Sequence, residues 1–263
     1  MLSRRRLLVA AGQLAGAGLL AACGIGLPEA VPGGRGEDDG ARLTARPEAA
    51  PTQAAEGPPP VPGTHPLGLE AVRDAVLHVP PGVVPGIAAP LVLTLHGAGG
   101  DAETGLALLR PLADERGLLL LAPASRKSTW DAVLGDYGQD AALIDRALAT
   151  VFATFAVDPG RVAVAGFSDG ASYALGLGLA NGGLLRRIVA FSPGFVPRGT
   201  PREGTPPVFV SHGDADDILP IDRTSREIVP ELRDDGYDVT YREFSGPHTV
   251  PPEIAREAVD WLG

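Results

Sequence analysis

The chain has 263 residues and is acidic, with 32 Asp and Glu residues against 22 Lys and Arg residues and a net charge of −10. An acidic surface disfavours binding to nucleic acid and adsorption to anionic lipid, so we expect neither as a partner. The single cysteine excludes an intrachain disulfide.

The first residues have the pattern of an export signal. Arg4-Arg5-Arg6 precedes an apolar stretch that is too short and too rich in Ala and Gly for a comfortable membrane span. The arginines resemble a twin-arginine signal, and Leu20-Ala21-Ala22-Cys23 resembles a bacterial lipobox. These resemblances imply that residues 1–22 are a signal peptide and that Cys23 is lipidated. The protein is then expected to be exported and anchored at the bacterial cell envelope, on the periplasmic or the outer surface. An ordinary secretory leader with an incidental cysteine is the alternative.

Residues 23–66 are expected to comprise the lipidated cysteine and a disordered tether. The segment 24–66 carries nine of the 26 prolines, many Gly and Ala residues, and no apolar periodicity. Such a composition buries too little apolar surface to offset the entropy cost of ordering. The folded domain is therefore predicted to comprise residues 67–263, which is enough chain for one domain with a sizeable core.

Beyond the tether, short apolar runs alternate with helical stretches. This alternation predicts a mostly parallel, twisted sheet with helices on both faces. The expected strands are 75–79, 90–95, 118–122, 161–165, 187–191, 207–210 and 239–244, and the expected helices are 104–116, 138–156, 171–179, 221–235 and 252–262. Only a short Pro- and Gly-rich loop, 192–206, follows the fifth strand. We therefore expect no large lid domain and an open site.

The segment Gly166-Phe167-Ser168-Asp169-Gly170 lies between an expected strand and an expected helix. A G-x-S-x-G sequence in this setting is typical of the sharp turn that exposes a nucleophilic serine. The two glycines are needed because a side chain at either position would collide with neighbouring backbone in so tight a turn. Ser168 is therefore the predicted nucleophile, with a glycine-rich turn of no catalytic role as the alternative.

A serine nucleophile needs a histidine base, and in this arrangement the base follows the serine in the chain. Only His212 and His248 do so. His248 lies on a loop between the last expected strand and the last expected helix, where its imidazole can reach the serine. We predict His248 as the base and interpret His212, at the end of a strand, as structural.

The acid that orients the imidazole should follow the strand before this loop. Asp214, Asp216 and Asp217 all lie there, and composition alone does not choose among them. A metal cluster of these three carboxylates is a minor alternative, because such residues on one loop are more often solvated. We expect neither a metal nor a cofactor.

Three further segments carry recognisable patterns. They are the later segments His212-Gly213-Asp214-Ala215-Asp216 and Gly246-Pro247-His248-Thr249-Val250, and the earlier segment Leu95-His96-Gly97-Ala98-Gly99-Gly100-Asp101. With the Ser168 turn, they resemble the H-G-x-x-D, G-x-H-x-V/I and L-H-G-x-G segments of the carboxylesterase/phospholipase group of α/β-hydrolases. The resemblance covers about residues 91–262 and implies the α/β-hydrolase fold. It implies Asp216 as the triad acid and His248 as the base. It also implies that the backbone N–H groups of Ala98 and Asp169 form the oxyanion hole.

Asp169 departs from the Gln or small residue that the resemblance leads us to expect. Its carboxylate is expected either to disfavour anionic acyl groups or to reach a neighbouring loop. Among aromatic side chains, Trp130, Phe167 and Phe195 are candidates for lining the substrate pocket, with ordinary packing as the alternative for each.

The resemblance implies a serine carboxylic-ester hydrolase that works through a Ser-His-Asp triad and an acyl-enzyme on small-molecule esters. Two alternatives are a peptidase or thioesterase with the same triad and a tethered binding lipoprotein without turnover.

Overall fold

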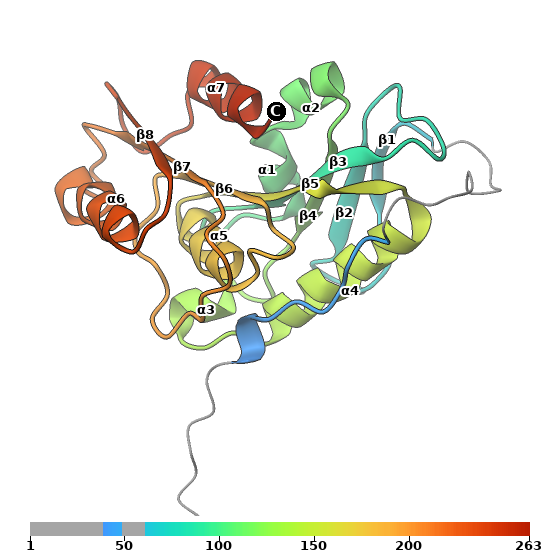
Figure 1. Ribbon diagram of the computed structural model, residues 1–263, viewed down its shortest axis with the longest axis horizontal. Helices are drawn as coiled ribbons and strands as arrows, with labels where there is room; N and C mark the ends of the chain where they lie inside the picture. The colour runs from blue at the N-terminus through green and yellow to red at the C-terminus, as the bar shows by residue number, and fades with distance from the viewer. Residues whose placement is uncertain (1–38, 49–60) are drawn as a thin grey trace, which may run out of the picture. The chain divides into compact units, whose positions relative to one another are not determined.

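The computed structural model describes residues 39–48 and 61–263 (Figure 1). The predicted signal peptide, the lipidation site Cys23 and much of the predicted tether lie outside the described residues. In the described part of the chain, no helix is long and apolar enough to cross a membrane.

A single sheet with the strand order β1-β2-β4-β3-β5-β6-β7-β8 forms the centre of the folded unit (Figure 1). The first two strands pair with each other and with β4 in antiparallel fashion, and every other pairing is parallel. This arrangement confirms the predicted, mostly parallel sheet. The strands are β1 (Gly63–Pro66), β2 (Ala75–Val79), β3 (Ala89–Leu95), β4 (Leu119–Pro123), β5 (Val157–Phe167), β6 (Arg187–Phe191), β7 (Val208–Gly213) and β8 (Val239–Phe244).

Helices cover both faces of the sheet, as predicted (Figure 1). One face carries α1 (Ala102–Ala107), α2 (Arg110–Arg116) and α7 (Pro252–Leu262), and the other carries α3 (Asp131–Leu134), α4 (Gln139–Thr154), α5 (Asp169–Ala180) and α6 (Ser225–Asp234). Short 3₁₀ turns, η1 (Asp39–Ala41) and η2 (Ile221–Arg223), complete the described elements. Because successive strand residues point to opposite faces, Leu91 and Leu93 of β3 pack in one core and Val92 in the other.

Two expected helices are interrupted. The segment 104–116 forms α1 and α2, separated at Leu108 and Leu109. Pro111 explains this break, because it has no N–H for the carbonyl of Ala107 and its ring would clash with that carbonyl in a continuous helix. The segment 221–235 likewise divides into η2 and α6 at Thr224. Residues 192–207 connect β6 to β7 without a helix, in line with the expected absence of a large lid.

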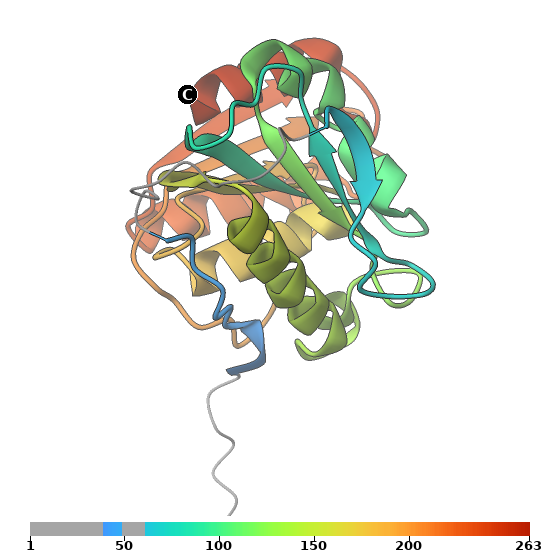
Figure 2. The ribbon, with the colours of Figure 1, turned by 90° about the vertical axis from the view of Figure 1, so that its right-hand side faces the viewer.

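The predicted boundary of the folded domain at residue 67 is wrong, because parts of the expected tether are folded. β1 is an edge strand of the sheet, paired with β2. The segment 39–48 lies beside α4 (Figure 2) and buries Ala41 and Leu43 in the core. The Asn181 side chain accepts a hydrogen bond from the Leu43 N–H (2.7 Å) and donates one to the Ala41 carbonyl (2.7 Å). These contacts offset the entropy cost of ordering the segment. From the composition alone, that cost was expected to keep the segment disordered.

Candidate active site

Ser168 occupies the turn between β5 and α5. Its backbone has φ 58° and ψ −122°, a conformation that is uncommon for a residue with a side chain and is found where function requires it. The Ser168 N–H donates to the Phe191 carbonyl of β6 (2.9 Å). A Cβ atom at Gly166 would lie 2.1 Å from the Gly170 carbonyl oxygen, and one at Gly170 would lie 2.3 Å from that of Leu95. The tight backbone approach therefore requires both glycines, as the sequence predicted.

The structure brings Ser168, His248 and Asp216 together at the C-terminal edge of the sheet. The Ser168 Oγ lies 2.9 Å from the His248 Nε2, and the His248 Nδ1 lies 2.6 Å from the Asp216 Oδ2. These residues follow β5, β8 and β7, and parallel strands end at the same edge. With its proton on Nδ1, the imidazole donates to Asp216 and presents a lone pair to the serine hydroxyl.

The Asp216 carboxylate is buried, and both of its oxygens have hydrogen-bond partners. Its Oδ1 accepts hydrogen bonds from the N–H groups of Ile218 (3.0 Å) and Leu219 (2.8 Å). Burial acts to raise the pKa of Asp216, but the hydrogen bonds from Leu219 and His248 outweigh it and hold that pKa below its ordinary value. The carboxylate therefore stays ionised and keeps its charge beside the imidazole.

The two neighbouring carboxylates have other surroundings. Asp214 accepts hydrogen bonds from the Gly246 N–H (3.0 Å) and the Ser245 Oγ (3.1 Å), and so holds the loop that carries His248. Asp217 is exposed. Of the three acids that the residues alone left open, Asp216 is therefore the one that contacts the imidazole.

His212 belongs to β7, and its side chain is buried against the loop that carries Asp216. Its Nδ1 lies 2.7 Å from the Ser225 Oγ, and its Nε2 lies 2.8 Å from the Leu219 carbonyl and 3.0 Å from the Asp216 Oδ2. Burial lowers the pKa of His212, which favours the neutral ring. These contacts agree with its interpretation as a structural histidine.

Two backbone N–H groups beside Ser168 donate to no other residue in the described part of the chain. In the loop 97–101 after β3, the N–H groups of Gly99, Gly100 and Asp101 bind Ser128, Gly97 and Thr104, whereas that of Ala98 has no such acceptor. Asp169 opens α5, where an N–H has no partner within the helix. The loop approaches the nucleophile closely, since a Cβ atom at Gly97 would lie 3.3 Å from that of Ser168. Both predicted oxyanion donors are therefore available to a ligand.

Trp130 does not line an open pocket, so its predicted role is wrong. Its side chain is 0% exposed, stacks 4.7 Å from the His96 ring and donates through Nε1 to the His96 carbonyl (2.9 Å). His96 in turn donates through Nδ1 to the Gly97 carbonyl (2.7 Å) and accepts the Ser125 N–H at Nε2 (3.0 Å). The pair supports the loop that carries Ala98. Burial lowers the pKa of His96.

The other two aromatic candidates are closer to the surface. The centroid of the Phe167 ring lies 4.6 Å from that of the His248 ring. Phe195, on the loop after β6, is 40% exposed. Their contact with a substrate stays a prediction. The Asp169 Oδ2 accepts a hydrogen bond from the Thr129 hydroxyl (2.6 Å), so this carboxylate reaches a neighbouring loop, one of its two expected roles.

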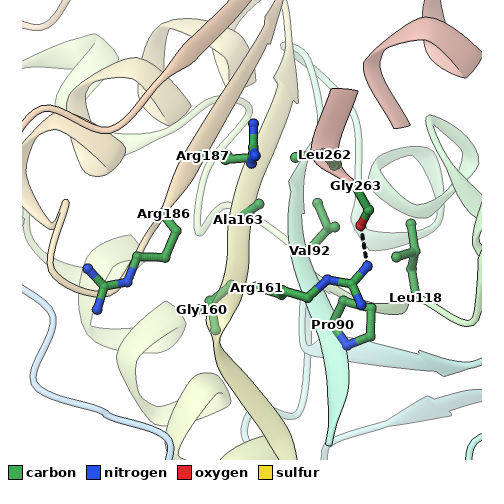
Figure 3. A pocket seen from close by; sticks show the side chains of 11 residues that line it. Pro90, Val92, Leu118, Gly160, Arg161, Ala163, Arg186, Arg187, Leu262 and Gly263 are labelled. Carbon is green, nitrogen blue, oxygen red and sulfur yellow. Dashed lines mark hydrogen bonds between the residues drawn. The ribbon is translucent and has the colours of Figure 1, made fainter. Parts of the chain in front are cut away.

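Two cavities differ in their relation to this site. A cavity of about 390 Å³ lies among residues 126–140, and Thr129, which binds Asp169, is part of its wall. A cavity of only about 20 Å³ lies at the opposite ends of the strands, where Arg161 donates to the Gly263 carbonyl (Figure 3). Among the described residues, no group of three or more His, Cys, Asp and Glu side chains is arranged to hold a metal ion.

Comparison with known proteins bears on the fold and on the class of enzyme. Residues 132–258 match the phospholipase/carboxylesterase family. The chain is similar to the crystal structure of esterase PE8, with 28% identity and a TM-score of 0.56 over 67% of this chain and 93% of that one. It is also similar to TT1662 from Thermus thermophilus, with 26% identity and a TM-score of 0.55 over 76% and 95% of the two chains. No curated protein sequence gives a significant match.

A third solved structure carries the name of the matched family. It is the phospholipase/carboxylesterase from Dyadobacter fermentans, with 24% identity and a TM-score of 0.53 over 72% of this chain and 96% of that one. The sheet order, the helices on both faces and these neighbours identify the α/β-hydrolase fold. With the matched family segment, they place the chain among the serine hydrolases of ester bonds.

Proposed function

We propose that the protein hydrolyses carboxylic esters of small or medium acyl groups through a Ser168–His248–Asp216 triad and an acyl-enzyme. The observation that carries this proposal is the line of hydrogen bonds from the Ser168 Oγ through His248 to Asp216. It lies beside the N–H groups of Ala98 and Asp169, which donate to no other described residue. Nucleophile, base, acid and oxyanion donors are the parts that acyl transfer requires.

In the first half of the reaction, the Ser168 Oγ attacks the acyl carbon while its proton passes to the His248 Nε2. The carbonyl π electrons move onto oxygen, and the Ala98 and Asp169 N–H groups stabilise that negative charge. Asp216 stabilises the imidazolium without accepting its proton. The tetrahedral intermediate then collapses, the bond to the alcohol oxygen breaks, and the His248 Nε2 proton passes to the leaving alcohol.

In the second half, water takes the place of the alcohol. His248 removes a proton from the water as its oxygen attacks the acyl carbon bound to Ser168. Collapse of the second intermediate breaks the bond to the Ser168 Oγ, which regains a proton from His248. The carboxylic acid leaves, and the triad returns to its starting protonation state.

The proposed substrate size follows from the surroundings of Ser168. Residues 192–207 contain no helix that could enclose a long acyl chain. Anchoring of the protein through Cys23 stays a prediction from the sequence.

Fluorophosphonate labelling with peptide mass mapping tests the nucleophile. We expect the wild type to carry the adduct on Ser168 and to hydrolyse p-nitrophenyl butyrate. Ser168→Ala should lose the label and at least about 10⁴-fold in kcat while keeping its circular dichroism spectrum.

Ser172→Ala is the matched control, one helical turn further along α5. It should still be labelled at Ser168. Turnover retained by Ser168→Ala, or a folded wild type that takes no label, would contradict the proposed function.

A further inference from the structure

Arg73 joins two loops of the active site from a part of the chain that carries no catalytic motif. It lies in the loop 67–74 between β1 and β2. Its guanidinium Nη2 donates to the Gly100 carbonyl (2.8 Å) and contacts the Ser125 Oγ (3.3 Å). Its Nε donates to the Ser125 carbonyl. One side chain therefore connects the oxyanion loop, residues 97–101, with the loop that follows β4.

The loop 67–74 is itself well supported. The Asp74 carboxylate accepts the N–H groups of Gly68 (2.6 Å), Leu69 (3.0 Å) and Glu70 (3.2 Å). Glu70 forms ion pairs with Arg126 and Arg146. Arg73 has φ 56°, a backbone conformation that costs energy for a non-glycine residue and persists where the surroundings enforce it.

The bonds of Arg73 close a ring around Ala98. Ser125, whose carbonyl Arg73 binds, donates its N–H to the His96 Nε2, and His96 holds the Gly97 carbonyl. Arg73 holds the Gly100 carbonyl on the other side of Ala98. The Gly97 carbonyl shares a peptide unit with the Ala98 N–H, so His96 holds that unit directly, while Arg73 holds the Gly100–Asp101 unit at the far end of the loop. An oxyanion donor contributes most when it is fixed in place before the charge develops.

We propose that Arg73 is a positioning residue for the oxyanion hole. It acts through Gly100 and Ser125 to keep the Ala98 N–H directed at the developing oxyanion. The inference rests on the proposed function and extends it to a residue outside the G-x-S-x-G, H-G-x-x-D and L-H-G-x-G segments. A guanidinium suits this role because its planar fork donates to two carbonyls at once, which an ammonium group does less well.

The test compares Arg73→Gln and Arg73→Lys with Arg110→Gln, an exposed arginine of α2 that pairs with Glu103. We expect Arg73→Gln to lose about 10- to 100-fold in kcat for p-nitrophenyl butyrate, with KM within about threefold, since the substrate carbonyl gains little from the hole before charge develops. Arg73→Lys should fall between Arg73→Gln and the wild type. Arg110→Gln should match the wild type.

Inhibition by an alkyl trifluoromethyl ketone distinguishes positioning from a general loss of structure. This ketone forms a tetrahedral adduct with the serine, whose oxyanion occupies the hole. We expect its inhibition constant in Arg73→Gln to rise by about the factor by which kcat/KM falls, as for a transition-state analogue. An unchanged inhibition constant despite a lower kcat, or a kcat within twofold of the wild type, would overturn the inference.

Two further outcomes keep this inference separate from the proposed function. If Arg73→Gln does not fold, judged by circular dichroism, Arg73→Lys decides by the same two measurements. A wild type without ester turnover or fluorophosphonate label would overturn the proposed function and this inference with it. An active wild type together with an Arg73→Gln variant whose kcat and inhibition constant match those of the wild type would overturn this inference alone.

Discussion

Three carboxylates lie on the loop after β7, and the structure gives each different surroundings. Asp216 contacts the imidazole of His248, whereas Asp214 holds the loop 245–248. We predict that Asp216→Asn lowers kcat by about 10⁴-fold, because an amide no longer fixes the imidazole tautomer or stabilises its charge. Steady-state hydrolysis of p-nitrophenyl butyrate measures the loss.

The neighbouring acids supply the controls. Asp214→Asn weakens the hold on Gly246 and should cost only about tenfold in kcat, since a small displacement of the base lowers the rate less than its loss. Asp217→Asn, at an exposed side chain, should leave kcat unchanged. Equal losses for Asp214→Asn and Asp216→Asn would mean that the loop, and not the triad acid, is responsible.

Sequence reasoning singled out Ser168 and His248 from their turn and loop, and the family resemblance chose Asp216 among three acids; the structure brings these three side chains together. Sequence reasoning misplaced Trp130, whose burial depends on the folding of the loop after β4 against the loop after β3. It missed Arg73, which belongs to no motif and whose role depends on contacts 27 and 52 residues away along the chain. Contacts between distant loops leave no local pattern in a sequence.

The buried side chain of Asn181 helps to hold the docked segment 39–48 in place. Asn181 binds the Leu43 N–H and the Ala41 carbonyl, and also donates to the Leu177 carbonyl. We predict that Asn181→Ala lowers the free energy of unfolding by about 2 kcal/mol, because it leaves buried backbone groups of the segment without partners. Urea titration followed by circular dichroism measures the change.

Deletion of residues 1–48 provides the matching comparison. If Asn181 acts through the segment, its substitution should cost much less in the shortened chain than in the full one. Equal costs in both chains would show that the Leu177 contact alone accounts for the effect.

Among the elements, the inner parallel strands were predictable because two-sided burial makes each of them a short apolar run, whereas the edge strand β8 was predictable from its alternation. β1 was not, because Gly63 and Pro66 gave it the composition of a linker and its stability comes from pairing with β2. The segment 39–48 also has the composition of a linker, and few of its described side chains are apolar; Ala41 and Leu43 are the ones that are fully buried. The prediction of one helix over residues 104–116 did not take account of Pro111, which divides it into α1 and α2.

For the molecule as a whole, two buried histidines make stability depend on pH. Burial lowers the pKa of both His96 and His212. In the unfolded chain these rings take up protons near the ordinary value of about 6.5, whereas in the folded chain they do so only at lower pH. The unfolded state thus binds more protons between these limits, and the free energy of unfolding should fall as the pH decreases below about 6.5.

The expected slope is up to about 1.4 kcal/mol per pH unit for each of the two histidines. Urea unfolding between pH 8 and pH 5 measures it, and His212→Gln should reduce it by removing one of the two rings. The depressed pKa of Asp216 adds a further loss at more acidic pH, as that carboxylate becomes protonated. A free energy of unfolding independent of pH in this range would contradict the neutral buried rings.

The spread of the site along the chain also determines when the site forms during folding. Ser168 and His248 are 80 residues apart, and each parallel strand pair between them needs a crossover connection before it can form. Contacts of such long range form slowly, because loop-closure entropy is lost before they contribute. On the ribosome, the oxyanion loop and Arg73 emerge well before the base. The proposed triad is therefore completed late in folding, when the loop after β8 brings His248 to Ser168.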